Sequence, residues 1–233
     1  MNGYFAQLSL WPDFREADTD GAVVHRIGRK DGIVPFDLET YHTVPLVLAS
    51  SSPSKCAILR ALGLRVLIDP ADIVEEVKPG DEPETVVRSL AEQKGRVVAR
   101  RHPEALVIGT DTIVYADGAP IGKPRDREHA RNILRRFSGT THSILTGLVV
   151  VEQKTLRQSL HVCRTDVTFR QLSPQTIERY VSTEEPMGKA GAYALQGTGA
   201  LLVERIEGEY SNVLGLPIPT LVTALGDLGY ELI

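Results

Sequence analysis

Residues 46–55 read LVLASSSPSK, an apolar run that passes directly into three serines, a proline and a lysine. Short continuous apolar runs are typical of strands buried inside a sheet. Ser52 is a good helix N-cap and Pro53 a good first helical residue, so a helix should begin here and end near Gly63. This strand–loop–helix unit predicts an α/β fold in which a polar loop follows the strand.

The chain beyond this unit continues the alternation of strands and helices. Strands are expected at residues 66–68, 105–109, 143–151, 160–169 and 200–206, and helices from Pro83, at 126–137, at 173–180 and at 217–228. Asp117-Gly118 predicts a hairpin turn. The two strands at 143–151 and 160–169 should lie antiparallel around a turn at Gln153-Lys154. These patterns place the whole of residues 45–233 in one α/β domain.

The first 44 residues have a different character. They contain the turn signals Trp11-Pro12-Asp13, Asp18-Thr19-Asp20-Gly21 and Arg29-Lys30-Asp31-Gly32, with only short apolar stretches between them. We therefore expect residues 1–44 to form an N-terminal extension that is partly ordered at best.

Composition narrows the class of protein. The 233 residues are 42% hydrophobic and 24% charged, with a net charge of −4, which does not favour a nucleic-acid polymer or a membrane surface as partner. The two cysteines, Cys56 and Cys163, are far apart, which speaks against a disulfide scaffold or a zinc site and fits a reducing compartment. The N-terminus does not resemble a signal peptide, and no apolar run is long enough for a transmembrane helix. We expect a cytoplasmic protein.

The serine-rich loop is the first candidate site. Small hydroxyl residues at the start of a helix expose free backbone N–H groups at the positive end of the helix dipole, which suits an anion. Ser50, Ser52 and Ser54 could line such a site, and Lys55 would add charge toward a phosphate. The alternative is a well-capped helix with an exposed lysine.

The second candidate is Gly109-Thr110-Asp111-Thr112. Here an apolar strand runs into a lone aspartate, which resembles a metal ligand or a general base at the carboxyl end of a strand. The alternative is an aspartate that simply makes a turn.

Further polar residues occur in glycine-rich contexts or in an acidic loop. Lys123 stands between Gly122 and Pro124, a constrained position that suits phosphate contact, while Lys189 and Gln196 lie within the glycine-rich stretch 189–197. Each of these side chains could equally be a surface residue, and so could Glu75 and Glu76, which could otherwise bind a divalent cation. Four histidines without metal-ligand spacing are expected to be structural or surface residues: His102, His129, His142 and His161.

Taken in order, these segments resemble the Maf family of nucleoside triphosphate pyrophosphatases. The resemblance extends over roughly residues 45–230 and rests on eight motifs in sequence order. They are LVLASSSP at 46–53, DIVE at 72–75, LAEQK at 90–94, GTDT at 109–112, GKP at 122–124, FSGTTH at 137–142, KAGAYALQG at 189–197 and YSNVLGLP at 210–217.

The resemblance implies a two-lobed α/β fold with a long mixed central sheet and an active-site cleft between the lobes, a plan shared with inosine-triphosphate pyrophosphatases. It implies a homodimer that hydrolyses a nucleoside triphosphate between the α- and β-phosphates with a divalent metal cation such as Mg²⁺ or Mn²⁺. The implied catalytic residues are Asp111, Glu75, Lys94 and Lys123, with Asp111 and Glu75 as metal ligands. The implied substrate-binding residues are Ser50, Ser52, Ser54, Lys55, Thr112, Lys189 and Gln196.

These roles agree with the chemistry of attack on an α-phosphate. The reaction needs an activated water, cations that neutralise the polyphosphate, and a carboxylate that holds metal or takes a proton. One departure from the family pattern concerns the phosphate loop, which usually continues Ser-Pro-Arg-Arg. Ser54 replaces the first arginine, and Lys55 keeps the charge of the second without its forked geometry.

Substrate choice follows from the C-terminal motifs, which resemble the branch that acts on dTTP and UTP and on modified pyrimidine nucleotides. The Gln196 amide can donate to a pyrimidine carbonyl and accept from its N3–H. Two alternatives are house-cleaning pyrophosphatases acting on 7-methyl-GTP or on inosine triphosphate. A third is a non-catalytic nucleotide-binding regulator of septum formation, against which the presence of both Asp111 and Glu75 argues.

Overall fold

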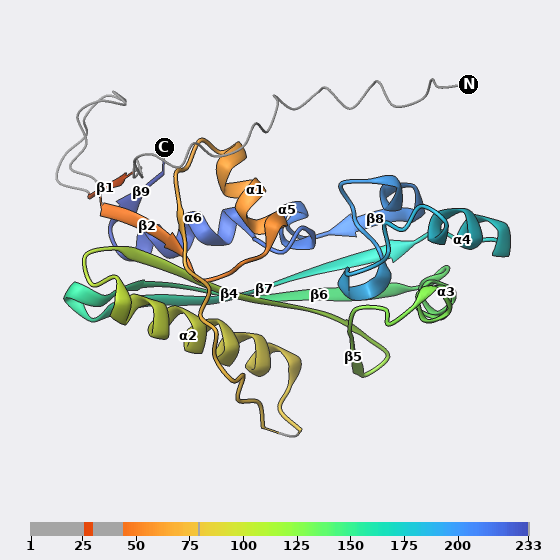
Figure 1. The fold of residues 1–233 in the computed structure, drawn as a ribbon, viewed down its shortest axis with the longest axis horizontal. Coiled ribbons are helices and arrows are strands. Elements are labelled where there is room, and N and C mark those ends of the chain that lie inside the picture. Colours follow the sequence, from red (N-terminus) through yellow and green to blue (C-terminus); the bar gives the residue numbers. More distant parts are fainter. Residues whose placement is uncertain (1–25, 30–43, 79, 233) are drawn as a thin grey trace.

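The computed structural model describes residues 26–29, 44–78 and 80–232 (Figure 1). The strands are β1 (Arg26–Arg29), β2 (Val44–Leu48), β3 (Leu67–Ile68), β4 (Leu106–Ala116), β5 (Ala119–Ile121), β6 (Thr141–Glu152), β7 (Arg157–Phe169), β8 (Val203–Glu207) and β9 (Tyr230–Glu231). The helices are α1 (Pro53–Ala61), α2 (Pro83–Arg101), α3 (Arg127–Phe137), α4 (Pro174–Val181), α5 (Tyr210–Val213) and α6 (Ile218–Asp227). In this part of the chain no helix has the length and apolar character that crossing a bilayer requires.

The strands form one mixed sheet in the order β8-β7-β6-β4-β2-β1-β9, with β3 beside β2 and β5 beside β4. Strand β2 is parallel to β3 and β4, whereas the long strands β4, β6 and β7 pair antiparallel. The prediction of an α/β fold with a long mixed central sheet is therefore confirmed.

Most predicted elements occur where the sequence placed them, and the differences have physical causes. The strand predicted at 105–109 is longer in the structure, because antiparallel pairing with β6 extends β4 to Ala116. The strand predicted at 200–206 begins later, at Val203, since Thr198–Leu202 form a 3₁₀ helix. Ser52 is the N-cap residue of α1, but within the described chain its side chain makes no capping hydrogen bond.

The predicted N-terminal extension contributes a strand to the sheet. Residues 26–29 form β1, which pairs antiparallel with the start of β2 on one side and with β9 on the other. Four residues of the extension thus pair with strands of the sheet. The turn signals at residues 11–13 and 18–21 and most of the signal at 29–32 lie outside the described residues.

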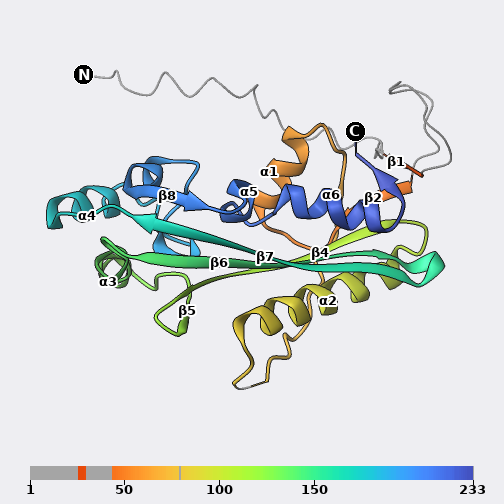
Figure 2. The ribbon, with the colours of Figure 1, turned by 180° about the vertical axis from the view of Figure 1, so that it is seen from behind.

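Helices cover both faces of the sheet at one end of the molecule, as the two opposite views show (Figures 1 and 2). Alternate side chains of β2 point to opposite faces of the sheet. Leu46 and Leu48 pack in a core with α1 and α6, and Val47 packs in a core with α2. A separate core at the other end joins α3 and α4 to β6 and β7 around Phe137 and Phe169. The long strands connect these cores.

Glycines allow α2 to lie directly on the sheet. A Cβ atom at Gly147 of β6 would overlap the backbone of Val87, and one at Gly109 of β4 would overlap the Ala91 carbonyl oxygen and the backbone of Gly95. Only residues without a side chain permit this approach. The close approach brings the middle of α2 over the middle of β4.

Candidate active site

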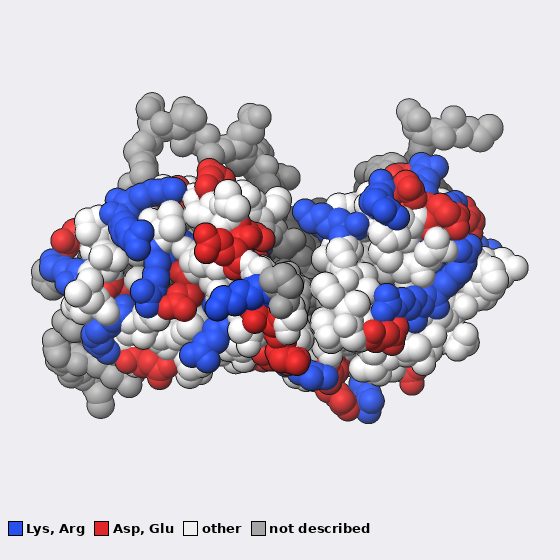
Figure 3. All heavy atoms as spheres, turned by 90° about the horizontal axis from the view of Figure 1, so that it is seen from below, with Lys and Arg blue, Asp and Glu red and all other residues white. Residues whose placement is uncertain are grey.

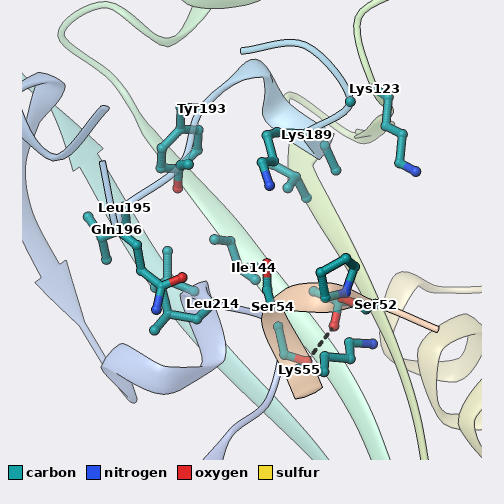
Figure 4. Close-up of a pocket in the computed structure, with 18 of the residues that line it drawn as sticks. Ser52, Ser54, Lys55, Lys123, Ile144, Lys189, Tyr193, Leu195, Gln196 and Leu214 are labelled. Carbon is teal, nitrogen blue, oxygen red and sulfur yellow. Dashed lines mark hydrogen bonds between the residues drawn. The ribbon is translucent and has the colours of Figure 1, made fainter. Parts of the chain in front are cut away.

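A pocket of about 490 Å³ lies between the start of α1 and residues 188–196, over β4 and β6. One wall comes from the loop after β2 and the start of α1, the floor from β4 and β6, and the opposite wall from residues 188–196 (Figure 4). Several predicted site residues line it: Ser50, Ser52, Ser54, Lys55, Asp111, Thr112, Lys123, Lys189 and Gln196.

Two carboxylates and a lysine form an ionic network beside this pocket. Lys94 Nζ lies 2.7 Å from Glu75 Oε1 and 2.5 Å from Asp111 Oδ1. Burial alone would lower the pKa of Lys94, but hydrogen bonds with Asp111 and Glu75 outweigh it and raise the pKa above its ordinary value. The ammonium group therefore stays charged and fixes the orientation of both carboxylates.

The same network reaches a second, smaller pocket of about 250 Å³. Glu75 and Lys94 line this pocket, and Ser50 and Ser51 line both it and the larger one. Because Asp111 faces the larger pocket, the network lies at the junction between the two.

Asp111 lies in the middle of a strand, so the prediction that it stands at the carboxyl end of a strand is wrong. Its Cα partner on β6 is Gly147, and β4 continues for five residues beyond it. On the other side, however, parallel pairing with β2 ends at Leu48 and Ile108, and the chain then turns into the serine loop. Asp111 is therefore accessible at the position where the neighbouring parallel strand has ended.

Lys55 is buried, which rules out the alternative of an exposed lysine at a helix start. Its side chain lines the larger pocket, and its Nζ donates a hydrogen bond to the Thr110 carbonyl oxygen at 3.4 Å. Burial lowers the pKa of Lys55 to about 8, with the Asp111 charge opposing that shift and the Lys94 charge adding to it. The preceding loop is held by the Ser52 N–H, which donates to Ser50 Oγ at 3.2 Å.

The remaining predicted residues occupy different parts of the pocket. Lys189 and Gln196 lie across the cavity from Ser54, and Lys123 lies at the rim (Figure 4). The Thr112 hydroxyl is engaged within the floor, 2.9 Å from the Thr146 hydroxyl and 3.3 Å from the Gly215 carbonyl oxygen. Thr112 thus shapes the floor of the pocket, and its hydroxyl already has protein partners.

Sequence reasoning gave no role to the aromatic group behind the 188–196 wall. Tyr193 lines the pocket, and its hydroxyl lies 2.9 Å from His142 Nε2, while the His142 ring stacks on Phe137 with centroids 4.0 Å apart. Burial lowers the pKa of His142 to about 4 and raises that of Tyr193, so both groups are neutral near pH 7. His142 is thus a buried residue that packs behind the wall of the pocket.

The carboxylates suit a hard divalent cation. Mg²⁺ usually binds one or two protein carboxylates and completes its shell with waters and substrate phosphates. Glu75 and Asp111 each use one oxygen toward Lys94, which leaves a second oxygen on each carboxylate beside the pockets. Within the described residues no group of three or more His, Cys, Asp or Glu side chains is placed to hold a metal ion.

An α/β sheet that holds a carboxylate–lysine network beside a serine loop and a lysine-lined pocket suits the class of enzymes that hydrolyse nucleotides. Comparison with known proteins agrees with that class. The family model described as "Maf-like protein" matches residues 45–228. Two relatives named "dTTP/UTP pyrophosphatase" cover about four fifths of this chain. That of Pelotomaculum thermopropionicum is 43% identical over 81% of this chain and 98% of its own length, and that of Moorella thermoacetica is 45% identical over 80% and 96%.

A solved structure, the Ham1 protein of Staphylococcus aureus, superposes with a TM-score of 0.37 and 12% identity over 53% of this chain and 71% of its own. The sequence matches are the informative ones. This chain belongs to the Maf family.

Proposed function

We propose that this protein hydrolyses dTTP and UTP to the nucleoside monophosphate and pyrophosphate. The observation that carries the proposal is the Glu75–Lys94–Asp111 network at the edge of a pocket that also presents Lys55, Lys123 and Lys189. Close relatives over nearly their full length bear the name dTTP/UTP pyrophosphatase, which supports both the reaction and the substrates.

Charge complementarity explains how the polyphosphate would bind. Lys55, Lys123 and Lys189 approach the larger pocket from different segments, so they can contact separate phosphate groups. The N-terminus of α1 adds free backbone N–H groups beside Ser52 and Ser54. On the face seen in Figure 3, basic and acidic side chains are interspersed without one dominant patch.

Asp111 is the residue best placed to take a proton from the attacking water. It faces the pocket, and Lys94 holds its carboxylate in one orientation through Oδ1. The second carboxylate, Glu75, is fixed by the same ammonium group. Lys94 therefore orients both acidic groups, while the other lysines neutralise charge on the departing pyrophosphate.

We propose that Asp111 and Glu75 also hold a divalent cation, Mg²⁺, Mn²⁺ or a similar ion. Such an ion supplies charge neutralisation on the phosphates and lowers the pKa of a bound water. Support comes from the two free carboxylate oxygens beside the pockets and from the preference of such ions for carboxylates combined with phosphates.

Pyrimidine selectivity is assigned to Gln196, which lines the wall away from the acidic network. Its amide can pair with the carbonyl and N3–H of thymine or uracil, whereas cytosine presents a different pattern at the same edge. A carboxylate at this position would better suit the cationic base of 7-methyl-GTP. The glutamine therefore favours dTTP and UTP as substrates over 7-methyl-GTP.

A panel of nucleotides tests the proposal. Pyrophosphate release is measured from dTTP, UTP, dCTP, 7-methyl-GTP and inosine triphosphate, each with Mg²⁺ or Mn²⁺. The expected order of kcat/KM places dTTP and UTP first. A preference for inosine triphosphate or 7-methyl-GTP would refute the assignment of substrate, and binding without turnover of any nucleotide would support a non-catalytic regulator.

The remaining architecture is also proposed from the family. We infer that residues 45–233 form the pyrophosphatase domain, with the pocket as a cleft between two lobes whose cores are separate, and that residues 1–44 precede it. A homodimer and a cytoplasmic location stay predictions, which sedimentation analysis and cell fractionation can test.

A further inference from the structure

One segment supplies an entire wall of the pocket, although it contains little regular secondary structure. Its lining residues are Gly188, Lys189, Ala190, Tyr193, Ala194, Leu195 and Gln196. Only short 3₁₀ turns, such as Ala190–Ala192, occur along it. The orientation of the recognition side chains must therefore come from contacts that hold the segment.

A single carboxylate ties together the two ends of this segment. Glu185 Oε2 accepts hydrogen bonds from the backbone N–H and the hydroxyl of Thr198, both at 2.8 Å. Glu185 Oε1 accepts from the Gly199 N–H at 2.8 Å and from the Tyr180 hydroxyl at 2.9 Å. Four donors thus converge on one side chain, which closes the segment into a loop.

The same group reaches the middle of the wall through Tyr180. The Ala194 N–H, two residues before Gln196, donates to the Tyr180 hydroxyl oxygen at 3.2 Å. A Cβ atom at Gly199 would lie 2.6 Å from the Ala194 carbonyl oxygen and 2.7 Å from the Tyr180 hydroxyl. The packing around these bonds is close enough to require glycine there.

The Glu185 carboxylate is suited to this holding role over a wide pH range. Burial would raise its pKa, but the hydrogen bonds from Gly199, Thr198 and Tyr180 outweigh burial and lower the pKa below the ordinary value. Hydrogen bonds to a charged acceptor are stronger than those to a neutral one. An amide in its place could not accept the same four hydrogen bonds.

We propose that Glu185 is a positioning residue for substrate recognition, which holds residues 186–199 so that Lys189 and Gln196 face the bound nucleotide. It acts through the loop and not by touching substrate. The inference rests on the proposed dTTP and UTP hydrolysis. The acidic network on the opposite side of the pocket is independent of it, since Glu75, Lys94 and Asp111 come from other segments.

The test compares Glu185→Gln and Tyr180→Phe with the matched control Glu184→Gln. Glu184 is the exposed neighbouring glutamate and pairs with Arg127 on α3. Steady-state kinetics on dTTP and dCTP are combined with hydrogen exchange of the 186–199 backbone. Glu185→Gln should raise KM for dTTP about 10-fold with kcat nearly unchanged, reduce the preference for dTTP over dCTP, and accelerate exchange in the loop.

Tyr180→Phe should show the same pattern more weakly, and it keeps the test decisive if Glu185→Gln does not fold. Glu184→Gln should match the wild type. Accelerated exchange with unchanged KM and unchanged preference would reduce Glu185 to a structural residue and overturn the inference. A fall in kcat alone would also overturn it, and a wild-type enzyme that releases no pyrophosphate from dTTP would instead overturn the proposed function.

Discussion

Asp111 shows how the neighbours of one residue suit it to the chemical role that we propose for it. It stands within a strand that is hydrogen-bonded to β6, yet β2 has ended beside it and Lys94 of α2 approaches to 2.5 Å. The sequence signal, an aspartate between two threonines after an apolar run, does not contain this information. The role depends on where a different strand stops and how closely a helix packs.

Asp111→Asn should lower kcat about 100-fold or more while the protein stays folded, because the amide has the same shape but cannot take a proton or bind a cation as a carboxylate does. The measurement is pyrophosphate release from dTTP together with a circular dichroism melt. Asp117→Asn, at the exposed hairpin turn and paired with Arg136, is the control and should retain activity. An Asp111→Asn enzyme with near-normal turnover would assign the base to another group.

Ser54→Arg should strengthen nucleotide binding. Lys55 is buried and directed to the Thr110 carbonyl oxygen, so it does not occupy the space that a longer side chain at position 54 would enter. A forked, charge-assisted contact with phosphate should lower KM for dTTP about 10-fold. Ala61→Arg adds the same charge to an exposed position of α1 and should leave KM unchanged. Equal effects of the two substitutions would show that only general charge matters.

At the scale of elements, the fit of α2 on the sheet determines where Lys94 lies. Gly147→Ala should push α2 outward, because the new methyl group would overlap the backbone of Val87. We expect a loss of about 1–3 kcal/mol in the free energy of unfolding and a fall in kcat as Lys94 moves from Asp111. Chemical denaturation and dTTP kinetics measure the two effects. Gly226→Ala meets no neighbouring atom and should show neither.

The packing of α3 against β6 should make stability depend on pH through His142. Since burial lowers its pKa to about 4 from an ordinary value near 6.5, only the unfolded chain binds a proton there between those values. The free energy of unfolding should therefore fall as pH drops from 6.5 to 4, by up to about 1.4 kcal/mol per pH unit. Denaturation of His142→Gln should show a flatter profile across this window, and an unchanged slope in this variant would contradict the assignment to His142.

Local sequence signals predicted most helices and strands, because capping residues, prolines and the periodic spacing of apolar residues determine secondary structure within a few residues along the chain. Ser173 caps α4 through the Thr176 N–H, and Asp117 and Gly118 form the turn between β4 and β5, as expected. The length of β4 could not be predicted, since pairing with a strand far along the chain decides it. The burial of Lys55 was equally non-local.

The candidate site likewise divides into features that the sequence predicted and features that depend on contacts between distant segments. Motif resemblance identified several of the residues that line the pocket, including Lys189 and Gln196, without their geometry. The Tyr180–Glu185 network was not identified, because its donors come from separate segments and no spacing marks them. Residues 26–29 join the sheet through partners at both ends of the domain, which no pattern within the extension indicates.

At the scale of the whole molecule, the long strands connect the cores at the two ends, and the pocket lies between them, with the acidic network on one side and residues 188–196 on the other. This arrangement predicts one reaction, the cleavage of the bond between the α- and β-phosphates. The most direct test is the identity of the first phosphorus product formed from dTTP and UTP, with Mg²⁺ and with excess chelator. The account predicts pyrophosphate together with the monophosphate, and loss of turnover in chelator. Orthophosphate as the first product, or undiminished turnover in chelator, would contradict it.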